Sequence, residues 1–167
     1  MALEYLDLSG LQHFKERQDL SFVIETKREH RFFKALPGDW GDGYENVTIL
    51  CSVEIQRRAD DRIPAFLKLP VRHKGILCEP LLEKLVLDAY LKTGEIAQVL
   101  CGGEQGADAR VCDFAWVLEL MNQCVNCGVA FRFLRTGTFF RKGNRIYRIA
   151  EEEQEEQARR AGVDYTP

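Results

Sequence analysis

Short apolar runs rich in β-branched residues alternate along the chain with longer segments in which apolar residues recur at helical spacing. Such runs predict buried strands, and the longer segments predict helices. The predicted strands span residues 21–26, 47–53, 74–79, 96–103 and 130–134. The predicted helices span residues 27–36, 54–69 and 114–127, with a less regular helical segment between residues 80 and 94.

Local signals define the ends of the predicted helices. Asp113 precedes the helix 114–127 in the position of an N-cap, and Gly128 follows it as a C-terminal stop. Pro64 is expected to bend or divide the helix that contains it. Pro37 is expected to end the helix before it, because proline cannot continue a helical hydrogen-bond ladder.

Strands that alternate with helices predict an α/β fold with a parallel sheet and right-handed crossovers. The five mainly parallel strands are followed by a predicted β-hairpin over residues 138–149, which turns at Lys142-Gly143-Asn144. A chain of 167 residues with 46% hydrophobic residues can bury one sizeable core. We therefore expect a single domain over residues 1–149 and a charged C-terminal tail over residues 150–167.

Composition narrows the class of protein. Charged residues make up 29% of the chain and the net charge is only −3, so a nucleic-acid partner is not indicated. The first residues lack the basic start and apolar stretch of a signal peptide, and the apolar runs are shorter than the roughly 20 residues that span a bilayer. The six cysteines then indicate reduced thiols. The sequence predicts a cytoplasmic protein with no membrane contact.

Three strand ends carry a glutamate shortly after a cysteine. The segments ILCSVE, GILCEP and VLCGGE end in Glu54, Glu79 and Glu104. In parallel α/β sheets chemistry gathers beyond the carboxyl ends of the strands, so these three carboxylates are the candidate catalytic residues. Two carboxylates about 4 Å apart repel by roughly 4 kcal/mol at an effective dielectric constant near 20. Cations must therefore lie among them, and the loops of the same edge supply Lys27, Arg28, Arg110 and Arg135.

Several interpretations of this edge remain open. The cluster can act as an internally neutralised acid and base site, bind a metal or a cationic substrate, or only cap helix N-termini and loop amides. The glycine-rich turn GGEQG lacks the spacing of a dinucleotide fingerprint and the lysine of a P-loop, so it does not favour phosphate binding.

The cysteines favour a structural role. Cys51, Cys78 and Cys101 end apolar strands, where thiols behave as small hydrophobes, although three converging thiolates are conceivable. Cys124 and Cys127 form a C-x-x-C pair at the C-terminal end of a helix, where no positive helix terminus stabilises a thiolate. The three histidines supply no second pair of zinc ligands, so no metal site is assigned.

An ordered series of motifs carries a family resemblance over roughly residues 15–149. The series is ETKREHRF, LPGDWGDGYENVTILCSVE, RADDRIP, CEPLL, CGGEQGADARVCDFAWV and QC..CGVAFRF..TG. It resembles the second half of a phage-type family of unknown function, the three-cysteine-motif, radical-SAM-like barrel proteins. The resemblance implies half of a TIM-like (β/α) barrel. The first half, which carries the cysteine motif for an iron–sulfur cluster, has no counterpart here.

The resemblance has consequences for cofactors, partners and site residues. Neither an iron–sulfur cluster nor S-adenosylmethionine is expected on this chain alone, which resembles a truncated or split protein. A homodimer or a companion chain is expected to complete the barrel. Departures from the family pattern occur at Phe133-Leu134-Arg135 and at Ile55. The family positions implied in substrate binding are Thr26, Lys27, Arg28, Ser52, Gly102, Gly103 and Arg110.

Three functional hypotheses follow. The leading one is a half of a radical-SAM-like barrel protein from a phage or mobile element that keeps the substrate side. The second is a binding or assembly module without catalysis, in which the glutamates are structural. The third is a metal-dependent hydrolase built on the carboxylates.

Overall fold

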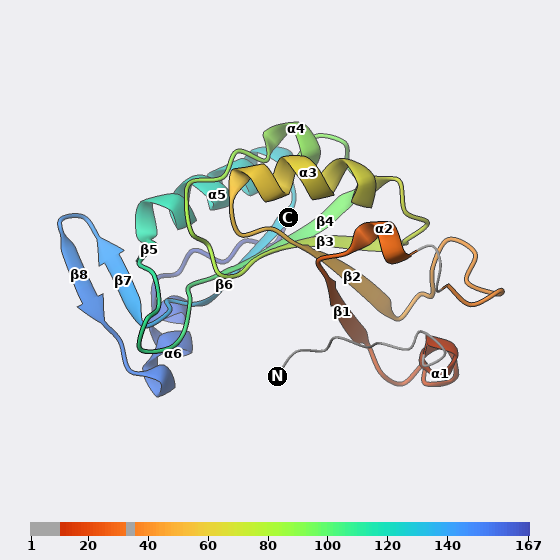
Figure 1. The fold of residues 1–167 in the computed structure, drawn as a ribbon, viewed down its shortest axis with the longest axis horizontal. Coiled ribbons are helices and arrows are strands. Elements are labelled where there is room, and N and C mark those ends of the chain that lie inside the picture. The colour runs from red at the N-terminus through yellow and green to blue at the C-terminus, as the bar shows by residue number, and fades with distance from the viewer. Residues whose placement is uncertain (1–10, 33–35) are drawn as a thin grey trace.

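The computed structural model describes residues 11–32 and 36–167. Its central element is a five-stranded sheet in the order β1-β2-β3-β4-β6, in which every neighbouring pair is parallel (Figure 1). These strands are β1 (Phe22–Thr26), β2 (Val47–Ser52), β3 (His73–Cys78), β4 (Ile96–Gly102) and β6 (Ala130–Arg135). The predicted α/β class and the five parallel strands are confirmed.

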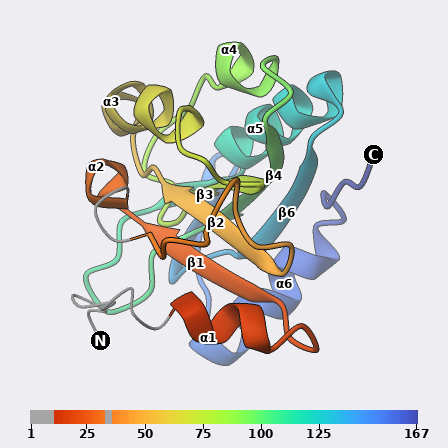
Figure 2. The ribbon, with the colours of Figure 1, turned by 90° about the vertical axis from the view of Figure 1, so that its right-hand side faces the viewer.

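A single layer of helices covers one face of this sheet. Figures 1 and 2 show α3 (Gln56–Leu67), α4 (Asp88–Leu91) and α5 (Phe114–Cys127) together on that face. The helix α3 turns Ala59, Ile63 and Phe66 inward, at the spacing of one helical face. Burial of a large apolar side chain such as Phe66 stabilises the fold by about 1.5–3 kcal/mol.

Strand register sorts the side chains between the two faces of the sheet. Cys51 pairs with Ile76, which pairs with Val99, and all three belong to the buried core under the helices. Side chains alternate along a strand, so the neighbours of these residues face the opposite side. The row that contains Glu25, Leu50 and its register partners therefore lies on the face away from α3–α5, here called the open face.

The open face has its own neighbours at the edges of the sheet. Figure 2 shows α1 (Leu11–Glu16) and α6 (Gln154–Arg160) on this side of the sheet. In the middle, Gly75 leaves the space that the Leu50 side chain fills, since a Cβ at Gly75 would lie 2.6 Å from Leu50 Cδ2.

The C-terminal residues pack on strand β6. Residues 150–167, predicted as a charged tail, form the 3₁₀ helix η3 (Glu151–Glu153), helix α6 and a bridge in which Tyr165 and Phe131 exchange backbone hydrogen bonds of 2.8 Å. Gln154 and Ala158, one turn apart, are buried, although α6 also carries Glu155, Glu156, Arg159 and Arg160. Burial of one side of α6 explains why this charged segment is ordered. The segment covers the outer edge of β6 through the bridge between Tyr165 and Phe131.

A second sheet joins the hairpin to the main domain. The hairpin is formed by β7 (Phe139–Lys142) and β8 (Arg145–Arg148), which confirms its predicted position. The two-residue strand β5 (Cys112–Asp113) pairs with β7 in parallel and was not predicted. Two residues are too short for a hydrophobic period to reveal them.

The helices agree in part with the prediction. Asp113 accepts a hydrogen bond of 2.9 Å from the Ala115 amide, and Gly128 ends α5 with a φ of 65°. Pro64 lies inside an uninterrupted α3, because a helix tolerates the missing amide when tertiary packing holds it. Within the predicted helix 27–36, Glu29–Phe32 form α2, residues 27, 28 and 36 are not helical, and residues 33–35 lie outside the described residues. The segment 80–94 contains the short helix α4.

The loop between α2 and β2 closes the core at the amino ends of the strands. Trp40 and Tyr44 are buried, and the Trp40 indole donates a 2.6 Å hydrogen bond to the Pro70 carbonyl. The two aromatic side chains at this edge therefore serve core packing. Within the described part of the chain, no helix has both the length and the apolar character needed to cross a membrane.

Candidate functional site

The candidate site lies at the carboxyl ends of the five parallel strands. Here Glu25, Ser52 and Glu79 project from β1, β2 and the residue after β3 toward the open face, as the alternation of the strands requires. The loops that follow the strands add further charged side chains. We call this group the strand-end cluster, and its members are Glu25, Lys27, Ser52, Glu54, Arg62, Glu79, Glu104, Arg110 and Arg135.

Glu54 is held between two cations. Lys27 Nζ lies 3.0 Å from Glu54 Oε1, and Arg62 Nη1 lies 3.1 Å from Glu54 Oε2. The same Arg62 nitrogen donates a 2.6 Å hydrogen bond to the Ser52 carbonyl. Burial raises the pKa of Glu54, but the hydrogen bond and charge of Lys27 and the charge of Arg62 outweigh it and leave the pKa lowered. Glu54 is therefore an anion at neutral pH.

Glu25 links the first two strands. Ser52 donates a 2.5 Å hydrogen bond to Glu25 Oε1, and Lys27 Nζ lies 4.0 Å from the same oxygen. Lys27 therefore bridges Glu25 and Glu54. Its position directly after β1 allows it to reach both carboxylates.

Glu79 differs from Glu54 because its pKa is raised and not lowered. Its Oε1 lies 2.7 Å from Arg135 Nε, and both side chains are less than one third exposed. Burial nevertheless raises the pKa of Glu79, the charge of Arg135 opposes this, and the charge of Glu25 adds to it. Gly102 makes the position feasible, since a Cβ there would lie 2.5 Å from Glu79 Oε1. Among the three strand-end glutamates, Glu79 is the one suited to carry a proton.

Glu104 forms a closed pair with Arg110. Arg110 donates from Nε and Nη2 to the two carboxylate oxygens at 2.8 and 2.7 Å, and its backbone amide donates a third bond of 2.8 Å. These hydrogen bonds lower the pKa of Glu104 to about 2. The glutamate in the glycine-rich turn thus anchors the following loop.

The glycines of the same turn permit close backbone packing. A Cβ at Gly103 would lie 2.2 Å from the Thr136 carbonyl oxygen, and one at Gly137 would lie 2.7 Å from the Glu104 carbonyl oxygen. The loop after β4 is therefore pressed against the loop after β6. Its glycines serve backbone contact within the protein.

The strand-end cluster is electrostatically continuous. Glu25 contributes to the raised pKa of Glu79, and Glu54 contributes to the raised pKa of Arg110, so charges on separate loops act on one another. The ion pairs alternate four glutamates with four cations, which balances the charge.

The predicted residues take different places in this arrangement. Ser52, Lys27 and Arg110 bond to the glutamates of the cluster, and Gly102 and Gly103 provide space for it. Thr26 is a register partner of the core residue Cys51, and its hydroxyl accepts a 3.1 Å hydrogen bond from the Arg28 amide. Thr26 thus shapes the turn that carries Arg28, whose side chain is exposed.

Sequence reasoning missed two members of the strand-end cluster, Glu25 and Arg62, and one residue that supports it, Gln105. Glu25 lies within a strand that was predicted to be buried. Alternation along this strand places Glu25 on the same face as the exposed Val23 and opposite to the buried Ile24. Arg62 reaches the cluster from α3, where one helical arginine among several offers no signal. Gln105 accepts a 2.7 Å hydrogen bond from Arg135 and so supports the cation that holds Glu79.

The cysteines do not fit an iron–sulfur cluster. Cys51, Cys78 and Cys101 are fully buried in the core under the helices, on the face away from the open face. Burial raises the pKa of Cys78 and of Cys101 well above the ordinary value, which disfavours the thiolate that a cluster requires. These thiols act as small core side chains.

Metal binding by the glutamates has no geometric support. In the ranges 11–32 and 36–167, no three or more histidine, cysteine, aspartate or glutamate side chains come together in a way that could hold a metal ion. Glu54, Glu79 and Glu104 each face their own cation instead. The arrangement of these glutamates therefore does not support the hypothesis of a metal-dependent hydrolase.

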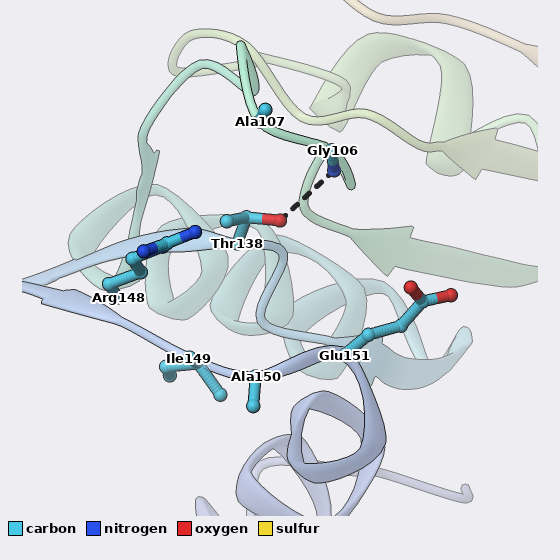
Figure 3. Close-up of a pocket in the computed structure, with 7 residues that line it drawn as sticks. All are labelled: Gly106, Ala107, Thr138, Arg148, Ile149, Ala150 and Glu151. Carbon is cyan, nitrogen blue, oxygen red and sulfur yellow. Dashed lines mark hydrogen bonds between the residues drawn. The ribbon is translucent and has the colours of Figure 1, made fainter.

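Two hollows lie beside the hairpin, and none of Glu54, Glu79 and Glu104 lines either of them. One, of about 410 Å³, is bounded by Gly106, Thr138 and residues 148–151 (Figure 3). There the Gly106 amide donates a 3.1 Å hydrogen bond to Thr138 Oγ1, and Arg148 and Glu151 lie at opposite ends of the hollow. The other, of about 490 Å³, lies between the hairpin, α5 and α6.

Comparison with known proteins places the chain in a family. A family model described as "Protein of unknown function (DUF5131)" matches residues 8–165, and the chain belongs to this family. No curated protein and no solved structure matches the chain.

Proposed function

We propose that these residues form the substrate-side half of a radical-SAM-like (β/α) barrel from a phage or mobile element. The strands that close the barrel would come from a second copy or from another polypeptide. The observation that carries the proposal is the sheet itself, which is parallel throughout and keeps the strands in chain order under one helical layer. A (β/α) barrel is built from this repeating unit.

The distribution of side chains supports the same proposal. In a barrel the helices lie outside and the other face of the sheet lines the interior, with chemistry at the carboxyl ends of the strands. Here the open face carries Leu50, Leu77 and Leu100 behind the strand-end cluster. At the first strand of the sheet, Val23 lies on this face with 60% of its surface exposed. Because β1 is the outermost strand of the sheet, its backbone edge is a place where additional strands can pair.

Within this proposal Glu79 is the proton carrier of the substrate side. Its raised pKa and its partial exposure match the requirements for general acid or base catalysis. Lys27 and Arg110 then serve as ligands for anionic groups of the substrate. The iron–sulfur cluster would belong to the part of the barrel outside these residues, since the buried cysteines described above do not fit one.

The mass of the protein in solution tests the proposal. Light scattering after size-exclusion chromatography should give a species heavier than the 19.2 kDa monomer, either alone or after coexpression with the product of the neighbouring upstream reading frame. A stable 19.2 kDa monomer under both conditions, with no binding of an apolar dye, would contradict it. Val23→Asp should abolish the larger species, whereas Val125→Asp on the outer side of α5, where the valine is also exposed, should leave it intact.

A binding or assembly module without catalysis is the second candidate. The pairing of Glu54 and Glu104 with cations favours it, because such pairs can serve only to hold loops. Calorimetric titration of the assembled species with S-adenosylmethionine separates the two candidates. The barrel proposal expects saturable binding, and the module expects none.

A further inference from the structure

The β7–β8 hairpin concentrates positive charge in an otherwise acidic protein. Residues 139–148 contain Arg141, Lys142, Arg145 and Arg148 and no aspartate or glutamate, whereas the whole chain carries a net charge of −3. All four residues of β8 are exposed, including Ile146 and Tyr147. The hairpin is thus a basic, partly aromatic projection at one end of the molecule (Figure 1).

The register of the hairpin places like charges opposite each other. Lys142 pairs with Arg145, and on the same face the next pair is Phe140 with Tyr147. Two cations directly opposite in an antiparallel pair destabilise it. Within the described ranges, Arg145 and Arg148 form no ion pair, and Lys142 lies over the Phe114 ring at 5.3 Å from its centroid. This contrasts with the strand-end cluster, where each glutamate has a cation.

A hollow of about 490 Å³ continues this face of the hairpin toward α5 and α6. Its wall contains three aromatic rings, from Phe114, Phe140 and Tyr147. It also contains the cations of Lys142, Arg148 and Arg160, of which Arg160 pairs with Glu156 at 2.8 Å, and one carboxylate, that of Glu153. Arg148 also lines the smaller hollow, which Figure 3 shows. The same cation therefore borders both hollows. Aromatic rings beside cations form a surface on which unstacked bases and phosphates can both be bound.

We propose that the β7–β8 hairpin and this hollow bind single-stranded nucleic acid. The phosphates contact Lys142, Arg145 and Arg148, and a base stacks on the exposed Tyr147 ring. An acidic peptide would satisfy the cations and leave the aromatic wall unused. A duplex keeps its bases stacked and cannot offer a face to Tyr147. This interaction does not depend on completion of the barrel.

Fluorescence anisotropy with a labelled oligonucleotide of about 12 nucleotides tests the proposal on the full chain, a length within the site sizes of single-strand binders. Binding should weaken steeply between about 50 and 200 mM salt, as release of condensed counterions requires. The duplex of the same sequence should bind more weakly. A polyglutamate competitor should not displace the oligonucleotide.

Two sets of variants separate charge from stacking. Lys142→Gln with Arg145→Gln should lower the slope of log affinity against log salt by roughly 1.4, since each phosphate contact on a single strand contributes about 0.7. Tyr147→Ala should weaken binding by about tenfold or more, whereas Tyr147→Phe, which keeps the ring, should not.

The matched control removes the same charge elsewhere. Arg57→Gln with Arg58→Gln alters two exposed arginines on α3 and should leave binding unchanged. Among the described residues, both arginines pair with Asp61 alone, at 3.8–4.0 Å. The proposal is overturned if the two double variants lose affinity equally or if the unaltered protein does not bind. Equal displacement by polyglutamate, or a preference for duplex, would also overturn it. No variant should unfold at a lower temperature than the unaltered protein, so loss of binding cannot be ascribed to unfolding.

Discussion

The strand-end cluster and the β7–β8 hairpin are both rich in charged side chains, but they differ in how these side chains are paired. In the cluster, Glu54, Glu79 and Glu104 each lie within 3.1 Å of a cation, and glycines bring the loops into backbone contact. In the hairpin, Arg145 faces Lys142 across the strands. The first region pairs its charges internally. In the second, Arg141 pairs with Asp113 at 3.3 Å, whereas Arg145 and Arg148 form no ion pair with any described residue.

The difference shows that burial determines the energetic cost of an unpaired charge in each region. Glu79 and Arg135 are largely shielded from water, so loss of either partner leaves a poorly solvated charge. Residues of the hairpin are solvated, so their repulsion costs little and persists in the folded protein. Substitutions in the cluster should therefore change stability, and those in the hairpin should change binding.

The largest expected effect is at Gly103. Gly103→Ala would place a methyl group 2.2 Å from the Thr136 carbonyl oxygen, and both backbones are constrained. We expect the free energy of unfolding to fall by about 3 kcal/mol in urea titrations, the upper range for overpacking. In the hairpin, Gly143 has a φ of 59° and no atom near its Cβ position. Gly143→Asn, which tolerates this conformation, should cost less than about 1 kcal/mol; equal losses at both glycines would refute the contrast.

The next effect concerns the ion pair of Glu79. Arg135→Met should lower the free energy of unfolding by about 2 kcal/mol at neutral pH, because the buried carboxylate loses its partner. The pKa of Glu79 should rise further. Since a raised carboxyl pKa favours the protonated folded state, the loss should shrink as the pH falls and Glu79 binds a proton. Arg135→Met with Glu79→Leu should recover part of the stability, and failure to recover any would argue against an isolated pair.

A smaller effect concerns acid unfolding and Glu104. Its pKa is lowered from 4.5 to about 2, so its contribution to stability is present above pH 4.5 and is lost as the pH falls toward 2. Glu104→Gln should flatten this part of the stability curve. We expect less than about 1 kcal/mol, because Arg110 is well exposed. Unfolding followed by circular dichroism across this pH range measures it, and an unchanged acid limb would contradict the assignment.

The smallest effect lies in the hairpin. Lys142→Gln with Arg145→Gln removes two opposed cations and should raise the free energy of unfolding by a few tenths of a kcal/mol, roughly the lower range for cross-strand pairs. The melting temperature should stay constant or increase slightly. A clear decrease would mean that these cations support the fold, and the distinction between the two regions would fail.

Much of the fold could be predicted from the sequence because it depends on local patterns. Apolar runs marked the five strands, and the capping residues Asp113 and Gly128 marked the ends of α5. The short strand β5 and the short helix α4 could not be predicted in this way. Their existence depends on packing partners distant in the chain, such as β7 for β5.

The candidate site was predictable in outline only. Strand ends pointed to Glu54, Glu79 and Glu104, but nothing in the sequence indicates which cation each one meets. Arg62 arrives from a helix and Arg135 from the far strand of the sheet. The overall charge of −3 likewise conceals the basic hairpin, because a sum over the chain carries no information about position.

Local order along the chain determined which segments become strands and helices and that acidic residues follow three of the strands, because hydrophobic period and turn chemistry act over a few residues. Only the tertiary structure decided that Glu79 keeps a raised pKa while Glu104 loses its proton readily. Burial and the nearest opposite charge set these values, and both arise when distant segments are brought together.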